Sequence, residues 1–299
     1  MCYTAIGILA MIAVTAPVFG QSAKGPLNLK PSSAWHVDYA DDRCRLARQF
    51  GEGESQVVAL LDRYGPDDFF RMTLTGKPMK TRVEKAEATV QFGPVEGPQQ
   101  LYFLNGNIGD SPALVFASRA RVGAASAAEQ LAIKERQDDE WIELAPIGPE
   151  REAAVKYLSI GKPLRRVVVL ETGSMRAPLA ALNKCIDDLV THWGVDVERH
   201  RNLTARAKPV NDPGKWVMSS DYPVKMLQSG QPAIVEFRLA IGPDGKPTSC
   251  HIQSTTRPKE FDAAVCSSLM KRARFSPAID ANGMPLASYY RNTVRFALP

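Results

Sequence analysis

The chain has 299 residues, 44% hydrophobic and 23% charged, a composition typical of a globular protein that is long enough for two modest domains. The net charge of +5 falls entirely after Asp212, since the preceding residues carry equal numbers of acidic and basic side chains. A basic region suits nucleic acid, anionic lipid or an acidic protein segment. No nucleic-acid-binding motif accompanies it, so the sequence disfavours nucleic acid as a partner.

The first residues favour export. Residues 2–19 are uncharged and mostly apolar, and Gly20 places a small residue before Gln21. This pattern predicts a secretory signal peptide over residues 1–20. An uncleaved membrane anchor is the alternative, because a run of about 18 residues reaches the lower limit for a membrane span. Residues 21–33 are polar and contain proline, which predicts a flexible lead-in.

Residues 34–200 predict a mostly β domain of unknown function that ends in a helix. The strand candidates are residues 43–50, 55–63, 68–75, 85–92, 99–104, 112–120 and 165–171. Residues 124–136 favour a short helix. Residues 178–193 predict an amphipathic helix, because Leu179, Leu182, Ile186, Leu189, Val190 and Trp193 share one face. No nucleophile elbow, phosphate-binding loop or zinc-protease motif occurs, so we predict no catalytic residue and no cofactor.

The cysteines agree with export. Without the leader, four remain, which allows three pairings. Residues 201–212 contain Lys208-Pro209 and predict a linker between two domains, and this division favours Cys44 with Cys185 and Cys250 with Cys266. Four free buried thiols are the alternative. No Cys-x-x-Cys occurs and the histidines are scattered, so no metal site is predicted.

Residues 213–299 predict a compact unit of two strands, a helix and a final strand. Apolar and polar residues alternate in Ala233–Ala240 as in a half-buried strand, and Asp244-Gly245 marks the turn that follows. A second strand runs through Cys250, and a helix begins near Lys259. In the final strand we expect Val294 and Phe296 to face inward, and Arg291, Thr293 and Arg295 to face outward.

The motifs of this unit follow a recognisable order. They are Tyr222-Pro223, Gly230, Val235-Glu236-Phe237, Asp244-Gly245, Phe261-Asp262, Arg274-Phe275-Ser276-Pro277-Ala278, Gly283-x-Pro285 and Phe296. In this order and spacing they resemble the C-terminal domain of the TonB energy-transducer family. The resemblance implies an α+β fold, with a helix packed on a small antiparallel sheet. It also implies a periplasmic, non-enzymatic binding module.

The resemblance further implies a partner and a binding mode. Family members bind a short extended segment of outer-membrane transporters, the TonB box, by adding it as a strand to a sheet edge, which supports energy-dependent transport. The residues implied to bind the partner are Asp221, Tyr222, Pro223, Arg291, Thr293 and Arg295. Arg291 and Arg295 would favour an acidic partner; edge protection alone is the alternative explanation for them.

The chain departs from the family pattern in two ways. Asp221 stands where the family commonly has glutamine, and an acidic residue at this position could alter or abolish the preference for the TonB box. A globular domain replaces the long proline-rich spacer, and coupling to an inner-membrane motor requires that the leader stays uncleaved. Two other hypotheses remain: an envelope enzyme with its chemistry in residues 35–200, or a structural envelope protein that self-associates through its sheet edge.

Overall fold

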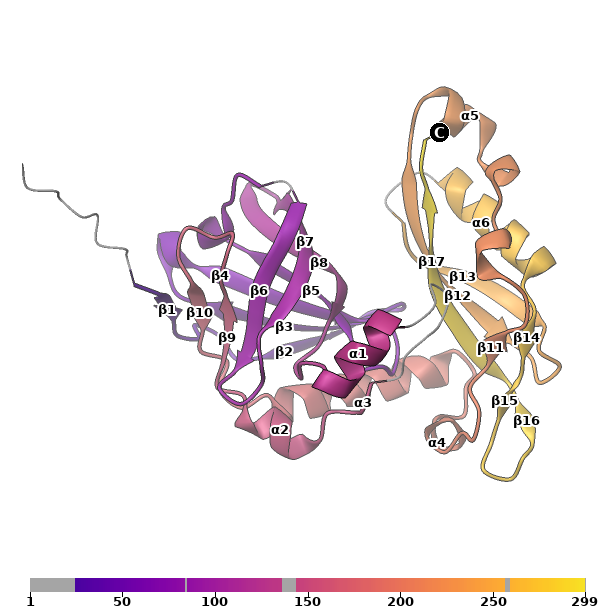
Figure 1. The fold of residues 1–299 in the computed structure, drawn as a ribbon, viewed down its shortest axis with the longest axis horizontal. Coiled ribbons are helices and arrows are strands. Elements are labelled where there is room, and N and C mark those ends of the chain that lie inside the picture. The colour runs from indigo at the N-terminus through magenta and orange to yellow at the C-terminus, as the bar shows by residue number, and fades with distance from the viewer. Residues whose placement is uncertain (1–24, 84, 136–143, 256–258, 299) are drawn as a thin grey trace, which may run out of the picture.

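The computed structural model describes residues 25–83, 85–135, 144–255 and 259–298. The predicted leader therefore lies outside the described residues. The fold is α+β, as predicted: a large, mostly β region is followed by a small antiparallel sheet with a packed helix (Figure 1). No helix within the described ranges is long and apolar enough to cross a membrane.

One mixed sheet of ten strands forms the N-terminal domain, in the order β1-β10-β9-β6-β7-β8-β5-β4-β3-β2. The sheet curls back on itself, because the chain after β1 pairs with the end of β3 through the Pro31–Phe50 bridge. Its strands are β1 (Leu27–Leu29), β2 (His36–Tyr39), β3 (Cys44–Phe50), β4 (Val57–Arg63), β5 (Phe70–Thr75), β6 (Lys85–Gly93), β7 (Gln99–Ile108), β8 (Ser111–Ala120), β9 (Tyr157–Ile160) and β10 (Val168–Leu170).

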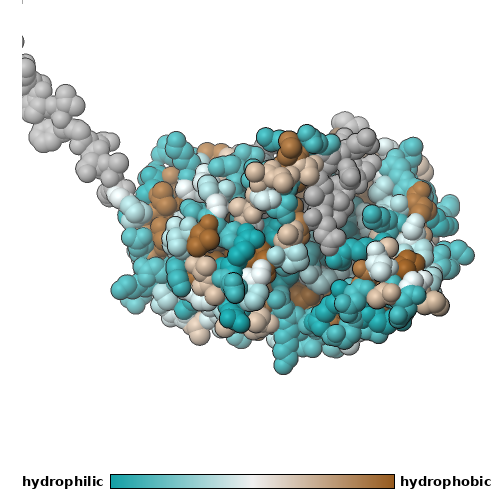
Figure 2. Space-filling model, turned by 60° about the horizontal axis from the view of Figure 1, so that its bottom comes forward, coloured by the Kyte–Doolittle hydropathy of each residue, from teal (hydrophilic) through white to brown (hydrophobic). Residues whose placement is uncertain are grey.

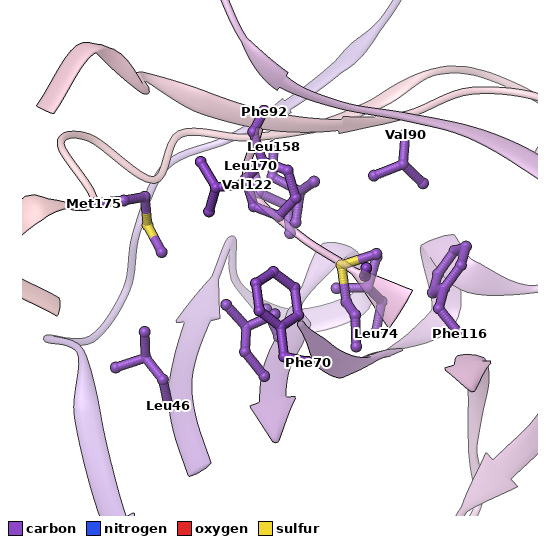
Figure 3. Close-up of a cluster of buried hydrophobic side chains, with 14 of the residues drawn as sticks. Leu46, Phe70, Leu74, Val90, Phe92, Phe116, Val122, Leu158, Leu170 and Met175 are labelled. Carbon is purple, nitrogen blue, oxygen red and sulfur yellow. The ribbon is translucent and has the colours of Figure 1, made fainter. Parts of the chain in front are cut away.

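Large apolar side chains fill the space inside this curled sheet. Alternation along each strand sends every second residue inward, and the inward residues of facing strands meet. Figure 3 shows Phe70 pointing toward Phe92 and Leu158 on the facing strands, and Phe116 pointing toward Val90. All five are at most 3% exposed. The interior is therefore a packed core.

The predicted helix of residues 178–193 is α3 (Arg176–His192), and its apolar face packs against β2 and β3. Leu179, Leu182, Ile186, Leu189 and Val190 are buried, as their spacing predicts. The remaining helices before the C-terminal domain are α1 (Ala127–Glu135), α2 (Pro149–Ala154) and α4 (Val197–Arg201). The short helix expected at 124–136 is α1.

The C-terminal domain contains a three-stranded antiparallel sheet, ordered β13-β12-β17, with α6 on one face (Figure 1). Gly245, in the β12–β13 turn, has φ 77°, and a Cβ there would lie 2.0 Å from the Phe275 carbonyl oxygen, so glycine is required. The elements are α5 (Val224–Gln228), β12 (Ala233–Ile241), β13 (Pro247–Thr255), α6 (Lys259–Arg272), β14 (Phe275–Ser276), β15 (Ala278–Ile279), β16 (Pro285–Leu286) and β17 (Ser288–Phe296).

Two segments expected to be irregular are paired. Leu27–Leu29, within the expected flexible lead-in, forms β1 in parallel with β10. Within the expected linker, β11 (Lys208–Pro209) pairs with β14, and Thr204 N–H donates to the Ile279 carbonyl over 2.9 Å. The proline and polar residues of both segments predicted irregular, unpaired chain. Their backbone groups instead bond to strands that are distant in the sequence. The expected linker, residues 201–212, is therefore bonded to the C-terminal domain.

The second face of the C-terminal sheet packs against the N-terminal domain. Arg71 of β5 pairs with Glu236 of β12, and Gln253 Nε2 donates to the Tyr64 carbonyl over 3.3 Å. His251 of β13 meets the Asp42 carboxylate. The junction is mainly polar. On the face that Figure 2 presents, hydrophobic residues are scattered among hydrophilic ones.

Candidate docking edge

β17 is an edge strand that pairs with β12 along its whole length, from Ser288 opposite Ile241 to Phe296 opposite Ala233. Val294 and Phe296 pack into the core beneath α6, as expected. The other side of β17 has no strand partner within the described residues. This is the edge at which a partner strand could add.

Asp221, Tyr222 and Pro223 lie where the chain enters the C-terminal domain. Asp221 makes a two-pronged ion pair with Arg272 of α6, at 2.5 and 3.0 Å, and this pairing lowers the pKa of Asp221 to about 2. The Tyr222 ring is buried against the ring of Phe296 at 5.2 Å, and its hydroxyl donates to a backbone carbonyl. Pro223 is the N-cap of α5. Tyr222 therefore packs on the end of β17, while Asp221 attaches the entry segment to α6.

Arg291 points away from the open edge. Its Nε donates to Gln253 Oε1 of β13 over 2.9 Å, so the side chain crosses β12 on the way. Its guanidinium also pairs with Asp67 of the N-terminal domain at 3.2 Å. Arg291 therefore holds the two domains together. These contacts could not be predicted from the sequence, because strand alternation predicts which face a residue lies on and not the direction in which a long side chain extends.

Thr293 and Arg295 are exposed on the second half of the strand. Arg295 makes no ion pair with any described residue. The Thr293 N–H donates to the side-chain Oδ1 of Asn292 over 2.8 Å. Asn292 was not among the residues predicted from the sequence. Asparagine is unfavourable in strands and readily bonds to nearby backbone groups. Its presence in a predicted strand could therefore have indicated a local hydrogen bond of this kind.

The first half of β17 is covered by α3 and α4. The ring of Tyr289 packs edge-on against Trp193 at 5.2 Å, and its burial raises the pKa of Tyr289 to about 12. Trp193 also lies under the Arg238 guanidinium at 4.3 Å. His200 stacks on Tyr289, and burial lowers the pKa of His200, which favours its neutral form. The exposed part of the edge is thus Asn292–Phe296.

Comparison with known proteins assigns this domain. Residues 218–298 match the family model described as Gram-negative bacterial TonB protein C-terminal. The C-terminal unit is a TonB C-terminal domain. The resemblance predicted from the ordered motifs is confirmed, and domains of this family are non-enzymatic interaction domains. No curated protein matches the chain.

Each domain contains one of the predicted cysteine pairs. Cys250 on β13 bonds to Cys266 on α6, which fastens the helix of the TonB C-terminal domain to its sheet. Cys44 on β3 bonds to Cys185 on α3 in the N-terminal domain. Both pairings are confirmed. Closure of loops with sequence separations of 16 and 141 residues stabilises the folded state mainly by restricting the unfolded chain.

Several buried ionisable groups in the N-terminal domain are used in internal contacts. Arg121 and Arg63 are at most 4% exposed, and both lie within 3.7 Å of Asp68. Asp62 is likewise buried beside Arg45. The described residues contain no cluster of three potential metal ligands.

A cleft of about 940 Å³ lies on the outer surface of β1, β9 and β10, and its walls include Lys156, Tyr157 and Glu171.

Proposed function

We propose that this protein binds an extended segment of an outer-membrane transporter by strand addition to β17. The observation that carries the proposal is the exposed half-edge Asn292–Phe296 in a TonB C-terminal domain. A strand edge offers backbone donors and acceptors, while neighbouring side chains select the sequence that binds.

Within this edge we assign direct contact with the partner to Thr293 and Arg295. Arg295 favours a carboxylate on the partner, because opposite charges on adjacent strands stabilise pairing. Asp221, Tyr222, Pro223 and Arg291 act indirectly. Tyr222 and Arg291 attach β17 to its surroundings, and Asp221 and Pro223 order the segment that enters the domain.

We assign the whole chain a non-enzymatic role in the periplasm, with the first 20 residues as a signal peptide. The packed core of the N-terminal domain and the internal pairing of its buried charges support the non-enzymatic role. We place the domain boundary in residues 201–212. Energy-dependent transport through an inner-membrane motor would require that the leader is retained as an anchor.

Calorimetric titration of the full chain with a synthetic transporter segment tests the proposal. The segment is an acidic, extended peptide from the periplasmic N-terminus of an outer-membrane transporter. We expect saturable binding that Arg295→Glu weakens about fivefold or more, because reversing the charge replaces attraction with repulsion. Arg165→Glu, on the exposed surface of the N-terminal domain, is the matched control and should bind as the wild type does.

Two results would contradict the proposal. One is equal weakening by Arg295→Glu and Arg165→Glu, which would indicate general charge attraction. The other is a concentration-dependent dimer that excludes the segment, observed by sedimentation, which would favour self-association through the same edge.

A further inference from the structure

Asn292 has an unusual place in β17, because both ends of its side-chain amide are bonded within the strand. Its Oδ1 accepts from the Thr293 N–H over 2.8 Å, and its Nδ2 donates to the Tyr290 hydroxyl over 2.9 Å. Tyr290 is itself held between aromatic rings, with its centroid 5.1 Å from that of Phe275 and 5.5 Å from that of Trp216. The Asn292 amide is therefore anchored to a rigid group.

The Thr293 N–H belongs to the open edge. Backbone N–H groups of an antiparallel strand point alternately toward each neighbour. This N–H bonds to a side chain of its own strand, so it points away from β12. Asn292 thus occupies a backbone donor that an added strand would need.

The other limit of the edge is set by His200 of α4. Its Nε2 lies 3.0 Å from Ser288 Oγ, and its ring stacks on Tyr289 with centroids 6.0 Å apart. Successive side chains of a strand point to opposite faces, so a ring that contacts both must lie across the edge or end of the strand. His200 therefore closes β17 at its first residues.

We propose that Asn292 is a removable cap on the docking edge, and that His200 confines strand addition to Asn292–Phe296. This inference rests on the proposed function of the edge. The partner that fits is a short extended segment of about five residues with a carboxylate near Arg295. Docking exchanges the Asn292 side-chain oxygen for a backbone carbonyl of the partner at the Thr293 N–H.

Hydrogen exchange of the Thr293 amide tests the cap without any partner. In full-length Asn292→Ala, measured by NMR and corrected for the intrinsic rate of the new sequence, we expect exchange about fivefold faster, the factor for loss of one ordinary hydrogen bond. Ser249→Ala, an exposed residue of the opposite edge strand β13, is the control and should leave the rate unchanged. An unchanged rate in Asn292→Ala would overturn the cap.

Titration with synthetic peptides tests the confinement and the exchange of bonds. The probe is an acetylated five-residue peptide of threonine and valine with one glutamate. Asn292→Ala should bind it about fivefold more tightly than the wild type, because no cap has to be displaced. A nine-residue peptide extended toward Ser288 should bind within about twofold of the short one.

The outcomes separate the two claims. Equal or weaker binding by Asn292→Ala would show that the cap is no barrier, and a tenfold gain for the longer peptide would overturn confinement. If neither protein binds either peptide, docking at this edge is overturned, while the exchange rate still decides the existence of the cap.

Discussion

At the scale of single residues, the TonB C-terminal domain uses its charged side chains in two distinct ways. Asp221 and Arg291 are bonded internally, at the entry to the domain and at the domain junction. Arg295, two residues beyond Thr293, is exposed and has no ion pair among the described residues. Position along one strand thus separates an arginine that stabilises the fold from one that suits recognition.

Asp221→Asn should lower the free energy of unfolding by about 1 kcal/mol at pH 7, because it removes an ion pair that retains some contact with water. The folded-state pKa of Asp221, about 2, lies below its ordinary value of 3.8. The stabilisation is therefore complete above about pH 4 and is lost as the pH falls toward 2. Urea unfolding at pH 7 and pH 3 should show a smaller difference between the proteins at pH 3; a constant difference would exclude this cause.

At the scale of elements, aromatic packing fixes the end of β17 to α6. The Phe261 ring is fully buried, 4.9 Å from the ring of Phe296 and 5.7 Å from that of Tyr222. Cys250–Cys266 attaches the same helix to β13. The position of the docking edge therefore depends on α6, which packs on the face of the sheet opposite to the N-terminal domain.

Phe261→Ala should reduce the free energy of unfolding by about 3–5 kcal/mol, since the truncation leaves a cavity among rings that cannot close around it. Thermal and urea unfolding followed by circular dichroism measure the loss. Leu131→Ala, on exposed α1, should cost less than about 0.5 kcal/mol and serves as the control. A loss below 1 kcal/mol for Phe261→Ala would contradict the packing.

Many of the helices, strands and disulfides were predictable from the sequence. The periodicity of residues 178–193 predicted α3, alternation predicted β12 and the inward faces of Val294 and Phe296, and the domain division predicted both disulfides. Strand β1 was missed because three residues carry too little periodicity. The partners of Arg291 and His200 were missed because they come from elements that only the tertiary fold brings together.

At the scale of the whole molecule, the two domains lie side by side (Figure 1). Charged and aromatic side chains connect them. Arg71 reaches Glu236 beside the exposed half of β17, and Asp67 holds Arg291 beside the covered half. The N-terminal domain thus covers one face of the sheet and leaves Asn292, Thr293 and Arg295 exposed. A globular domain can position a docking edge in this way without chemistry of its own.

A double-mutant cycle with Arg71→Ala and Glu236→Ala should give a coupling energy of about 0.5–1 kcal/mol, the range for partly exposed ion pairs. The coupling should fall in 1 M salt, because the screening length shortens to about 3 Å. Urea unfolding of the full chain measures it. Zero coupling at low salt would contradict the contact between the domains.

The most direct test of the account is the binding of an acidic transporter segment to full-length Thr293→Pro. Among the backbone donors, proline removes only the Thr293 N–H, which points to the open edge, so the pairing of β17 with β12 should persist. We predict a native circular dichroism spectrum with binding weakened at least about tenfold, because strand addition loses a backbone bond and meets the proline ring. Wild-type affinity in a folded Thr293→Pro protein would contradict strand addition at this edge.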